Sequence, residues 1–226
     1  MKPTAIIPAR GGSKRIPKEN IRLLAGKPAI AYPIELALDS GLFERVVVTT
    51  DDEEIASIAR EIGAEVPFIR SVELSDDFAI TIEVIADTLQ KLEIADIGFA
   101  CCIYPVTPLL TKDRLNQAYE ILKTNLWDYV FPACEYITPI ERAFRKNSSG
   151  QVNFLDPNFV STRTQDIEKS YYDAGQFYFG KIAAWKHMRP ILSGKSTFIE
   201  LSKNETLDID EIEDWKLVES LVQLRL

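Results

Sequence analysis

The most constraining feature of this sequence is an alternation of wholly apolar, β-branched runs with amphipathic stretches. Short apolar runs of this kind are typical of strands that are buried on both faces of a parallel sheet. Strands are expected at residues 4–8, 46–50, 97–104, 129–134 and 198–201, and helices at residues 28–39, 51–62, 80–91, 112–125 and 211–224. The series predicts an α/β fold with three αβα layers, in which helices cover both faces of a mainly parallel sheet.

The pattern changes around residues 142–159, where short pieces flank a turn at residues 147–150. A turn rich in Asn, Ser and Gly between short apolar pieces predicts a hairpin. We expect one domain over residues 1–226, with a lobe inserted at about residues 138–170. Such an excursion often builds an extra lobe or a subunit contact.

Charge and composition exclude several classes of function. The formal net charge is −8, whereas general nucleic-acid binding needs a basic face. The longest uncharged stretch, residues 97–111, contains one glycine and two prolines and does not fit a membrane-spanning helix. Cys101, Cys102 and Cys134 fit neither a disulfide framework nor a zinc spacing. We therefore expect a cytoplasmic protein with buried reduced thiols and with no nucleic-acid or membrane partner.

A basic, glycine-rich loop follows the first expected strand, over residues 7–20. It lies at the carboxyl edge of the sheet, where α/β proteins bind ligands. Gly11 and Gly12 let backbone N–H groups approach a phosphate closely. Four bases add positive charge, namely Arg10, Lys14, Arg15 and Lys18. The spacing matches neither the P-loop nor the dinucleotide fingerprint, so the loop predicts an anion site of another type, and the alternative is a solvated basic loop.

A pair of carboxylates follows near the end of the chain, at Asp208 and Asp210. In an extended segment these side chains point to the same face, because the strand period is two. Two hard oxygen ligands on one face suit Mg²⁺, which also takes water and substrate phosphates. The alternative is an exposed acidic turn with Asp210 as the N-cap of the last helix.

Other segments are weaker indicators of a site. The aromatic cluster at residues 171–179 is more typical of a core, so at most half of its side chains are expected to touch a ligand. Arg70 and Arg163, taken alone, fit ordinary surface residues. His187, the only histidine, lies between Lys186 and Met188 and is expected at the surface, so Ser-His-Asp and Cys-His catalysis are not expected.

The loop at residues 7–20 resembles the signature loop of the cytidylyltransferases that activate sialic acid and related nonulosonic acids. Residues 26–28 and 50–56 also fit that family, and the resemblance extends over nearly the whole chain. Residues 162–166 and 171–178 are most similar to members that act on pseudaminic acid. Members that act on sialic acid tend to carry a second Arg in the first of these stretches, and Asn-Gly followed by a small residue in the second.

The resemblance implies transfer of CMP from CTP to the anomeric hydroxyl of a nonulosonic acid, with Mg²⁺ as cofactor and pyrophosphate as leaving group. The implied catalytic residues are Arg10, Lys14, Asp208 and Asp210, of which Asp208 and Asp210 would bind the metal. The implied nucleotide-binding residues are Ala9, Arg10, Gly11, Gly12, Ser13, Lys14, Asn20, Arg70, Tyr104 and Thr107. The implied sugar-binding residues are Arg163, Gln165, Tyr172, Asp173 and Gln176. The family usually forms dimers through its extra lobe, so a homodimer with a dimerisation lobe is expected.

Two positions depart from the family's pattern. Members commonly place a base directly before the loop asparagine, where this chain has Glu19, with Lys18 one residue earlier. Sialic acid members tend to have Gln where this chain has Tyr104, so contacts to cytosine from that position would differ, by stacking or through the backbone. No side chain stands out as general base, and a metal-bound water and Asp208 both remain open for that role.

Several functions remain open at this stage. The acceptor can be pseudaminic acid, sialic acid, legionaminic acid or the eight-carbon acid KDO. In a different class, the chain would be a nucleotide-binding regulator without turnover. The joint presence of the loop bases and both acidic residues favours the enzyme.

Overall fold

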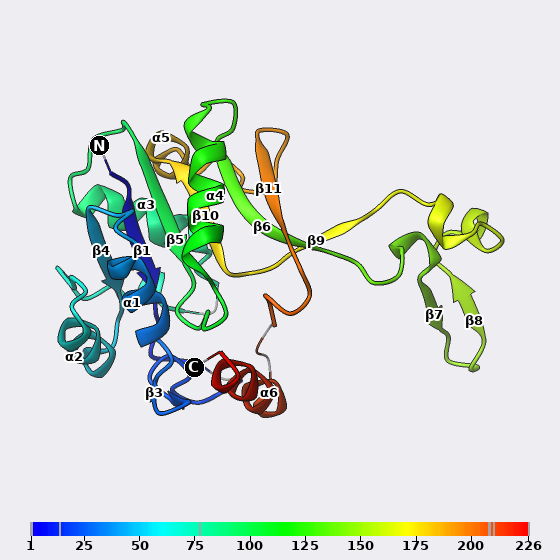
Figure 1. Ribbon diagram of the computed structural model, residues 1–226, viewed down its shortest axis with the longest axis horizontal. Coiled ribbons are helices and arrows are strands. Elements are labelled where there is room, and N and C mark those ends of the chain that lie inside the picture. Colours follow the sequence, from blue (N-terminus) through cyan, green and yellow to red (C-terminus); the bar gives the residue numbers. More distant parts are fainter. Residues whose placement is uncertain (1, 14, 77, 208, 210, 226) are drawn as a thin grey trace.

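The computed structural model describes residues 2–13, 15–76, 78–207, 209 and 211–225. Across these residues, seven strands form one sheet in the order β11-β6-β10-β5-β1-β4, with β9 paired to β6. The strands are β1 (Thr4–Pro8), β4 (Arg45–Thr49), β5 (Phe99–Ile103), β6 (Tyr129–Glu135), β9 (Tyr171–Asp173), β10 (Phe177–Lys181) and β11 (Ser196–Leu201). Figure 1 shows the sheet at the centre of a compact body, from which one long excursion departs.

Five of the seven strands point in the same direction, and only β9 and β10 point the other way. β1 pairs in parallel with both β4 and β5, and β6 pairs in parallel with β11. β10 runs antiparallel between β5 and β6, and β9 runs antiparallel to β6. The predicted α/β fold with a mainly parallel sheet is therefore confirmed, whereas the antiparallel strand in its centre was not anticipated.

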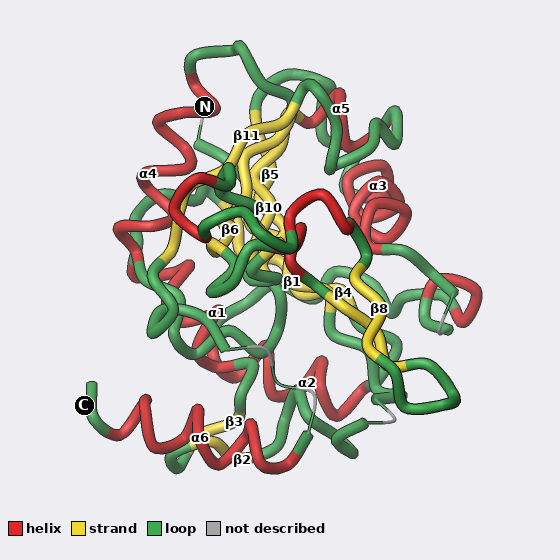
Figure 2. Tube along the Cα trace, turned by 90° about the vertical axis from the view of Figure 1, so that its right-hand side faces the viewer, coloured by secondary structure: helices red, strands yellow, loops and turns green. Residues whose placement is uncertain are grey.

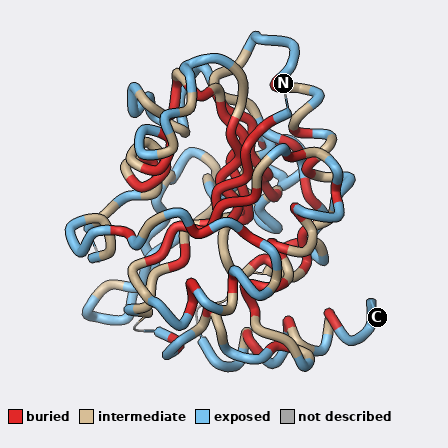
Figure 3. The backbone as a smooth tube through the Cα atoms, turned by 90° about the vertical axis from the view of Figure 1, so that its left-hand side faces the viewer, coloured by how far each residue is buried: buried red, intermediate tan, exposed pale blue. Residues whose placement is uncertain are grey.

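Helices cover both faces of the sheet, which gives the three predicted layers. The helices are α1 (Ala31–Asp39), α2 (Glu53–Ile62), α3 (Thr81–Lys91), α4 (Lys112–Lys123), α5 (Ile182–Lys186) and α6 (Ile212–Gln223). Ile7 packs with α1, α2 and α4 on one face, and its neighbour Ile6 packs with α3 and α5 on the other. Because successive strand residues alternate between faces, both sides of β1 must be apolar. Figure 3 shows the buried residues concentrated in these central strands.

Helix α2 begins directly beside the basic loop. The Asp52 carboxylate caps its N-terminus by accepting hydrogen bonds from the amides of Glu54 and Ile55 at 2.8 and 3.1 Å. Gly63 ends the helix in the left-handed conformation, at φ 112°, where a side chain would be strained. These signals fix the end of β4 and the start of α2 at the sheet edge where the loop lies.

Residues 136–170, between β6 and β9, form an arm that projects far from the body (Figure 1). The arm contains η2 (Ile140–Arg142), the hairpin β7 (Phe144–Lys146) and β8 (Val152–Phe154), η3 (Pro157–Phe159) and η4 (Thr164–Asp166). The rings of Phe144 and Phe154 face each other across the hairpin at 5.7 Å, yet both remain substantially exposed. Figure 2, viewed from the side of the arm, shows this hairpin in front of the sheet.

The last helix, α6, closes the lower end of the body beside a small hairpin of β2 (Leu23–Leu24) and β3 (Lys27–Pro28) (Figures 1 and 2). Its Trp215 is buried in an apolar cluster and donates a hydrogen bond to the Leu23 carbonyl at 3.3 Å. The same cluster contains Ile16 of the basic loop, so α6 supports that loop from below.

Cys101, Cys102 and Cys134 are buried and free, as expected. None of the helices in the described part of the chain has the length and apolar character needed to cross a membrane.

Candidate active site

The basic loop begins where β1 ends, and hydrogen bonds to the end of β4 hold its backbone in place. The Ala9 amide donates to the Thr49 carbonyl at 3.0 Å, and the Gly11 amide donates to the Asp51 carboxylate at 3.0 Å. A Cβ atom on Gly11 would lie 2.6 Å from an oxygen of Asp52, so a larger residue does not fit without movement. In this conformation both amides already have acceptors within the protein, whereas Gly12 is exposed.

Two arginines flank this anchored loop. Arg70 is almost completely buried, and its guanidinium donates to the Ser75 hydroxyl at 3.0 Å and lies 3.8 Å from the Asp51 carboxylate. Burial lowers the pKa of Arg70 from its ordinary value, and the charge of Asp51 opposes that shift. Arg10 donates to the Asp76 carbonyl at 2.9 Å, which ties the loop to the segment that leads into α3.

A polar hollow of about 340 Å³ opens beside the loop and contains four of the predicted residues: Arg10, Asn20, Arg70 and Tyr104. Asn20 is buried, and its side-chain amide donates to the Arg10 carbonyl at 2.8 Å. Its Oδ1 atom has no hydrogen-bond partner among the described residues. A buried acceptor without a donor is costly, so this oxygen indicates where a ligand N–H group would bind.

A small hollow of about 140 Å³ adjoins the polar hollow, and the two share Arg15, Glu19, Tyr104 and Pro105. Its lining includes the predicted residues Thr107 and Gln176, both buried. The Thr107 hydroxyl donates to the Tyr104 carbonyl at 3.0 Å, which fixes the turn that carries Tyr104. Leu207 and Ile209, the described neighbours of the predicted acidic pair, also line this hollow.

An apolar hollow of about 460 Å³ lies on the other side of Tyr104. Its wall is formed by Ile80, Ile82, Met188, Pro190, Ile191 and Leu192, together with Thr81, Tyr104, Asp173 and Tyr178. The Tyr104 hydroxyl lies 3.0 Å from the Thr81 hydroxyl, and its ring meets the Tyr178 ring edge-on at 5.6 Å. Tyr104 therefore lines all three hollows and forms the wall between them.

Asp173 supplies a carboxylate to the apolar hollow. It accepts a hydrogen bond from the Tyr178 hydroxyl at 2.6 Å and one from the Gly175 amide at 2.9 Å. Burial and the nearby carboxylate raise the pKa of Tyr178 far above its ordinary value, so this hydroxyl stays protonated and remains a donor. The Asp173 side chain, already held by two donors, is preorganised to accept further hydrogen bonds from a ligand.

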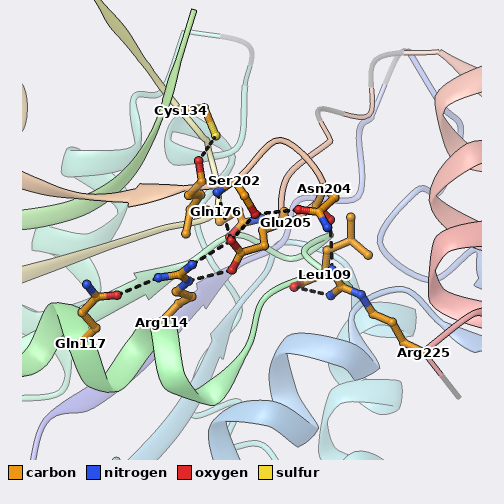
Figure 4. Close-up of polar contacts among 10 residues, drawn as sticks. Leu109, Arg114, Gln117, Cys134, Gln176, Ser202, Asn204, Glu205 and Arg225 are labelled. Carbon is orange, nitrogen blue, oxygen red and sulfur yellow. Dashed lines mark hydrogen bonds and ion pairs between the residues drawn. The ribbon is translucent and has the colours of Figure 1, made fainter. Parts of the chain in front are cut away.

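The turn between β11 and the predicted acidic pair is fixed by a polar network (Figure 4). Arg114 of α4 makes two hydrogen bonds to the Glu205 carboxylate, at 2.7 and 2.8 Å. The Glu205 carbonyl accepts a hydrogen bond from the Gln176 side chain at 2.7 Å, which joins the turn to the small hollow. Arg225 donates to the carbonyls of Leu109 and Asn204 and so ties the end of α6 to the same place.

Several predicted residues lie elsewhere. Arg163 and Gln165 are on the arm, where Arg163 is exposed and pairs with Asp166 at 2.7 Å. Tyr172 lies on β9 with its ring 5.0 Å from Tyr136 at the base of the arm. Lys14, Asp208 and Asp210 are outside the described residues.

The structure pairs Lys18, the residue before position 19, with an acidic residue of α2. Its ammonium group pairs with the Glu54 carboxylate of α2 at 2.5 Å, outside the three hollows. Glu19 itself lines both the polar and the small hollow.

Several residues around these hollows have no recognisable signal in the sequence. Asp76 lies in the segment before α3, Thr81 is the first residue of α3, and Met188 to Leu192 follow α5. Asp51 was visible as part of an acidic run, but its bond to the Gly11 amide depends on the pairing of β1 with β4.

Comparisons with known proteins identify the family of the chain. Residues 4–226 match the family model described as cytidylyltransferase. The chain therefore belongs to the cytidylyltransferase family, and its enzyme class is that of the nucleotidyltransferases.

Individual relatives show which cytidylyltransferases the chain is similar to. The chain is 43% identical over 226 residues to the pseudaminic acid cytidylyltransferase of Campylobacter jejuni. That alignment spans 99% of this chain and 97% of the relative. It is 34% identical over 239 residues to the CMP-N,N'-diacetyllegionaminic acid synthase of Legionella pneumophila. The alignment again spans 99% of this chain and 97% of the relative. Among solved structures, a CMP:2-keto-3-deoxy-manno-octonic acid synthetase complexed with CTP aligns over 100% of both chains, with a TM-score of 0.72 and 15% identity, and supports the fold alone.

Proposed function

We propose that this chain transfers CMP from CTP to the anomeric hydroxyl of pseudaminic acid and releases pyrophosphate. The observation that carries the proposal is the position of Tyr104 between a polar hollow with Arg10, Asn20 and Arg70 and an apolar hollow with Asp173. Two adjoining compartments of opposite character suit a charged nucleotide and a partly apolar sugar. The similarity to pseudaminic acid cytidylyltransferases over nearly the whole chain supports this pair of substrates.

We place the nucleotide in the polar hollow. The free Oδ1 atom of Asn20 suits the amino group of cytosine, and the guanidinium groups of Arg10 and Arg15 suit phosphate oxygens. Ser13 lies in the same loop and would add a hydroxyl donor. Attack of the anomeric oxygen on the α-phosphorus forms one P–O bond and breaks the bond to pyrophosphate. Positioning and charge neutralisation supply most of the catalysis in such transfers.

We place the sugar in the apolar hollow. Pseudaminic acid ends in a methyl group where sialic acid ends in a hydroxyl, and an apolar wall loses little against a methyl group. Ile80, Met188 and Leu192 provide such a wall, and Asp173 provides a fixed acceptor for sugar hydroxyl or amide groups. The hollow offers few polar partners for a terminal hydroxyl, which favours pseudaminic acid over sialic acid.

We propose Mg²⁺ as the cofactor, held by Asp208 and Asp210. The two carboxylates are hard oxygen donors of the kind that Mg²⁺ prefers, and their described neighbours Leu207 and Ile209 line the small hollow beside the loop. No group of three or more His, Cys, Asp or Glu side chains that suits a metal occurs among the described residues. When bound, the ion would neutralise charge on the triphosphate and on the leaving pyrophosphate.

We also propose a homodimer built through the arm. Seven apolar side chains on the arm are exposed: Ile137, Ile140, Phe144, Val152, Phe154, Leu155 and Val160. An apolar surface on a projecting element is typical of a subunit contact. Arg163 and Gln165, which lie on the arm and away from their own chain's hollows, would then be available to the site of the second copy. Light scattering at micromolar concentration tests this, since a monomer would contradict it.

We propose a cytoplasmic location. The three free cysteines are buried without a disulfide, which suits a reducing compartment. Fractionation of the native cells, with the chain detected by antibody, tests the location.

Pyrophosphate release from CTP and Mg²⁺ is the experiment that tests the enzymatic proposal. The acceptors are pseudaminic, sialic and legionaminic acids and KDO, offered singly and then in equal-concentration competition. We expect CMP-pseudaminic acid to be the main product when the acceptors compete at equal concentration. A preference for another acid would change the acceptor only, whereas no release with any acceptor would favour a nucleotide-binding regulator without turnover.

A further inference from the structure

Asp51 joins two parts of the candidate site without lining it. Its Oδ1 atom accepts a hydrogen bond from the Gly11 amide at 3.0 Å, and the same atom lies 3.8 Å from the Nη2 atom of Arg70. Gly11 belongs to the basic loop, and Arg70 lines the polar hollow. Asp51 itself lies outside the three hollows. Apart from its charge, any effect of Asp51 on a ligand there passes through these two partners.

Arg70 depends on Asp51 for its counter-charge. The Arg70 side chain is buried, and its Nε and Nη1 atoms donate to neutral acceptors, the Ser75 hydroxyl at 3.0 Å and the Thr49 carbonyl at 3.3 Å. Asp51 supplies the one carboxylate that pairs with this guanidinium within the described part of the chain. A buried charge is costly unless it is paired, and a planar guanidinium whose three nitrogen atoms each face a different acceptor has a fixed orientation. Asp51 provides the third of these acceptors.

The end of β4 anchors both partners of Asp51 through their backbone. The Ala9 amide of the basic loop donates to the Thr49 carbonyl at 3.0 Å, and the Arg70 amide donates to the Thr50 carbonyl at 2.7 Å. Asp51 follows these two carbonyl groups directly in the chain. Its carboxylate therefore adds a side-chain bridge between two segments that hydrogen bonds already hold against the end of β4.

We infer that Asp51 is a positioning residue of the nucleotide site, which holds the Arg70 guanidinium and the basic loop in one fixed arrangement. The inference rests on the proposed function, because that function places CTP in the polar hollow. The Gly11 amide, expected from the sequence to face a phosphate, serves in this arrangement to fix the loop. A ligand that enters the hollow then meets a loop and a guanidinium that are already oriented, so less conformational freedom is lost on binding.

Isothermal titration calorimetry with CTP and Mg²⁺ tests the inference on Asp51→Asn. The asparagine keeps the size of the side chain and an acceptor for the Gly11 amide, but it leaves the buried Arg70 without its counter-charge. We expect CTP to bind roughly five- to twentyfold more weakly than to the wild type. The matched control is Asp52→Asn, which removes the same charge one residue away and keeps the cap of α2, since asparagine caps helices as well as aspartate does. Its CTP affinity should stay within about twofold of the wild type.

A cycle with Arg70→Met shows whether Asp51 acts through the arginine. If it does, Asp51→Asn should weaken CTP binding by no more than about twofold in a protein that already carries Arg70→Met. Fully additive losses would contradict the inference. A merely structural role would lower the melting temperature of Asp51→Asn but leave the CTP affinity of the folded protein unchanged, and this result would overturn the inference.

An equal loss of affinity in Asp52→Asn would also overturn it, since the effect would then come from net charge. If Asp51→Asn does not fold, Asp51→Glu decides, because it keeps the charge but moves the carboxylate by one methylene group. Asp51→Glu should bind CTP more weakly than Asp52→Glu, and equal affinities would refute the positioning role. A wild type that does not bind CTP would contradict the proposed function and the inference with it, whereas wild-type affinity in Asp51→Asn would overturn the inference alone.

Discussion

The ion pair between Arg114 and Glu205 holds the turn that leads to the predicted metal ligands, and its contribution to stability can be worked out from the structure. Glu205 accepts two hydrogen bonds from Arg114, at 2.7 and 2.8 Å, and one from the Ser202 amide at 3.0 Å. The hydrogen bonds from Arg114, followed by those from Ser202, lower the pKa of Glu205 from 4.5 to about 2, against the opposing effect of burial. The charged form is therefore stabilised by folding.

The sign and size of the effect follow from linkage. A group whose pKa is depressed on folding adds stability above its unfolded pKa, and that stability is lost as the pH falls through the folded pKa. A fall from 4.5 to about 2 sets a ceiling of about 3 kcal/mol at neutral pH. The side chains of Arg114 and Glu205 keep 29% and 20% of their exposure, so solvent screening reduces the expected value to about 1–2 kcal/mol.

The assay is urea unfolding of the wild type and Glu205→Gln between pH 7 and pH 3. We expect Glu205→Gln to be less stable by about 1–2 kcal/mol at pH 7, and the difference to shrink as the pH falls below about 4.5. A cycle with Arg114→Met isolates the pair, since the double variant should lose less than the sum of the two single variants. A difference that stays constant down to pH 3, or a Glu205→Gln protein as stable as the wild type at pH 7, would refute the reasoning.

Three other substitutions test the site itself. Gly11→Ala should lower kcat/KM by about tenfold or more, because the added Cβ would lie 2.6 Å from an Asp52 oxygen and displace the loop. A variant with the kcat/KM of the wild type would contradict this. Arg10→Ala should lower kcat/KM by about a hundredfold while the melting temperature changes by no more than about 2 °C, since Arg10 is only partly buried on a loop beyond the sheet edge. Calorimetric melting beside kinetics separates the two effects. Asp210→Ala should remove Mg²⁺-dependent turnover, and wild-type rates at saturating Mg²⁺ would exclude Asp210 as a ligand.

The strands were predictable because their burial leaves little choice of side chain. Residues 4–8 were predicted as a strand and form β1, since both faces of that strand are covered and its central positions must be apolar. The start of α2 at Asp52 and its end at Gly63 were predictable from local capping chemistry. The central place of β10 was not, because strand order is set by long-range pairing that leaves no local pattern.

The candidate site, like the fold, has parts that could be predicted from the sequence and parts that could not. The loop with Arg10 was predicted from its composition, because glycines and bases must be contiguous to surround a phosphate, whereas Asn20 was implied by the resemblance to the family. The apolar hollow was not, because Thr81, Tyr104 and Met188 are far apart in sequence and meet only when α3, β5 and the segment after α5 pack together. Asp173 was proposed as a polar contact, and the structure places it in that hollow.

The position of Tyr104 links the two halves of the proposed reaction. Its ring lines the polar, small and apolar hollows, and its hydroxyl is tied to Thr81 at the start of α3. The loop that leads to Thr81 also carries Asp76, whose carbonyl accepts a hydrogen bond from Arg10. A movement of Arg10 toward a phosphate would therefore be transmitted along this loop to the wall of the apolar hollow. Since the proposed transfer requires both reactants to be positioned at once, this shared wall would link the hollow proposed for the nucleotide to the hollow proposed for the sugar.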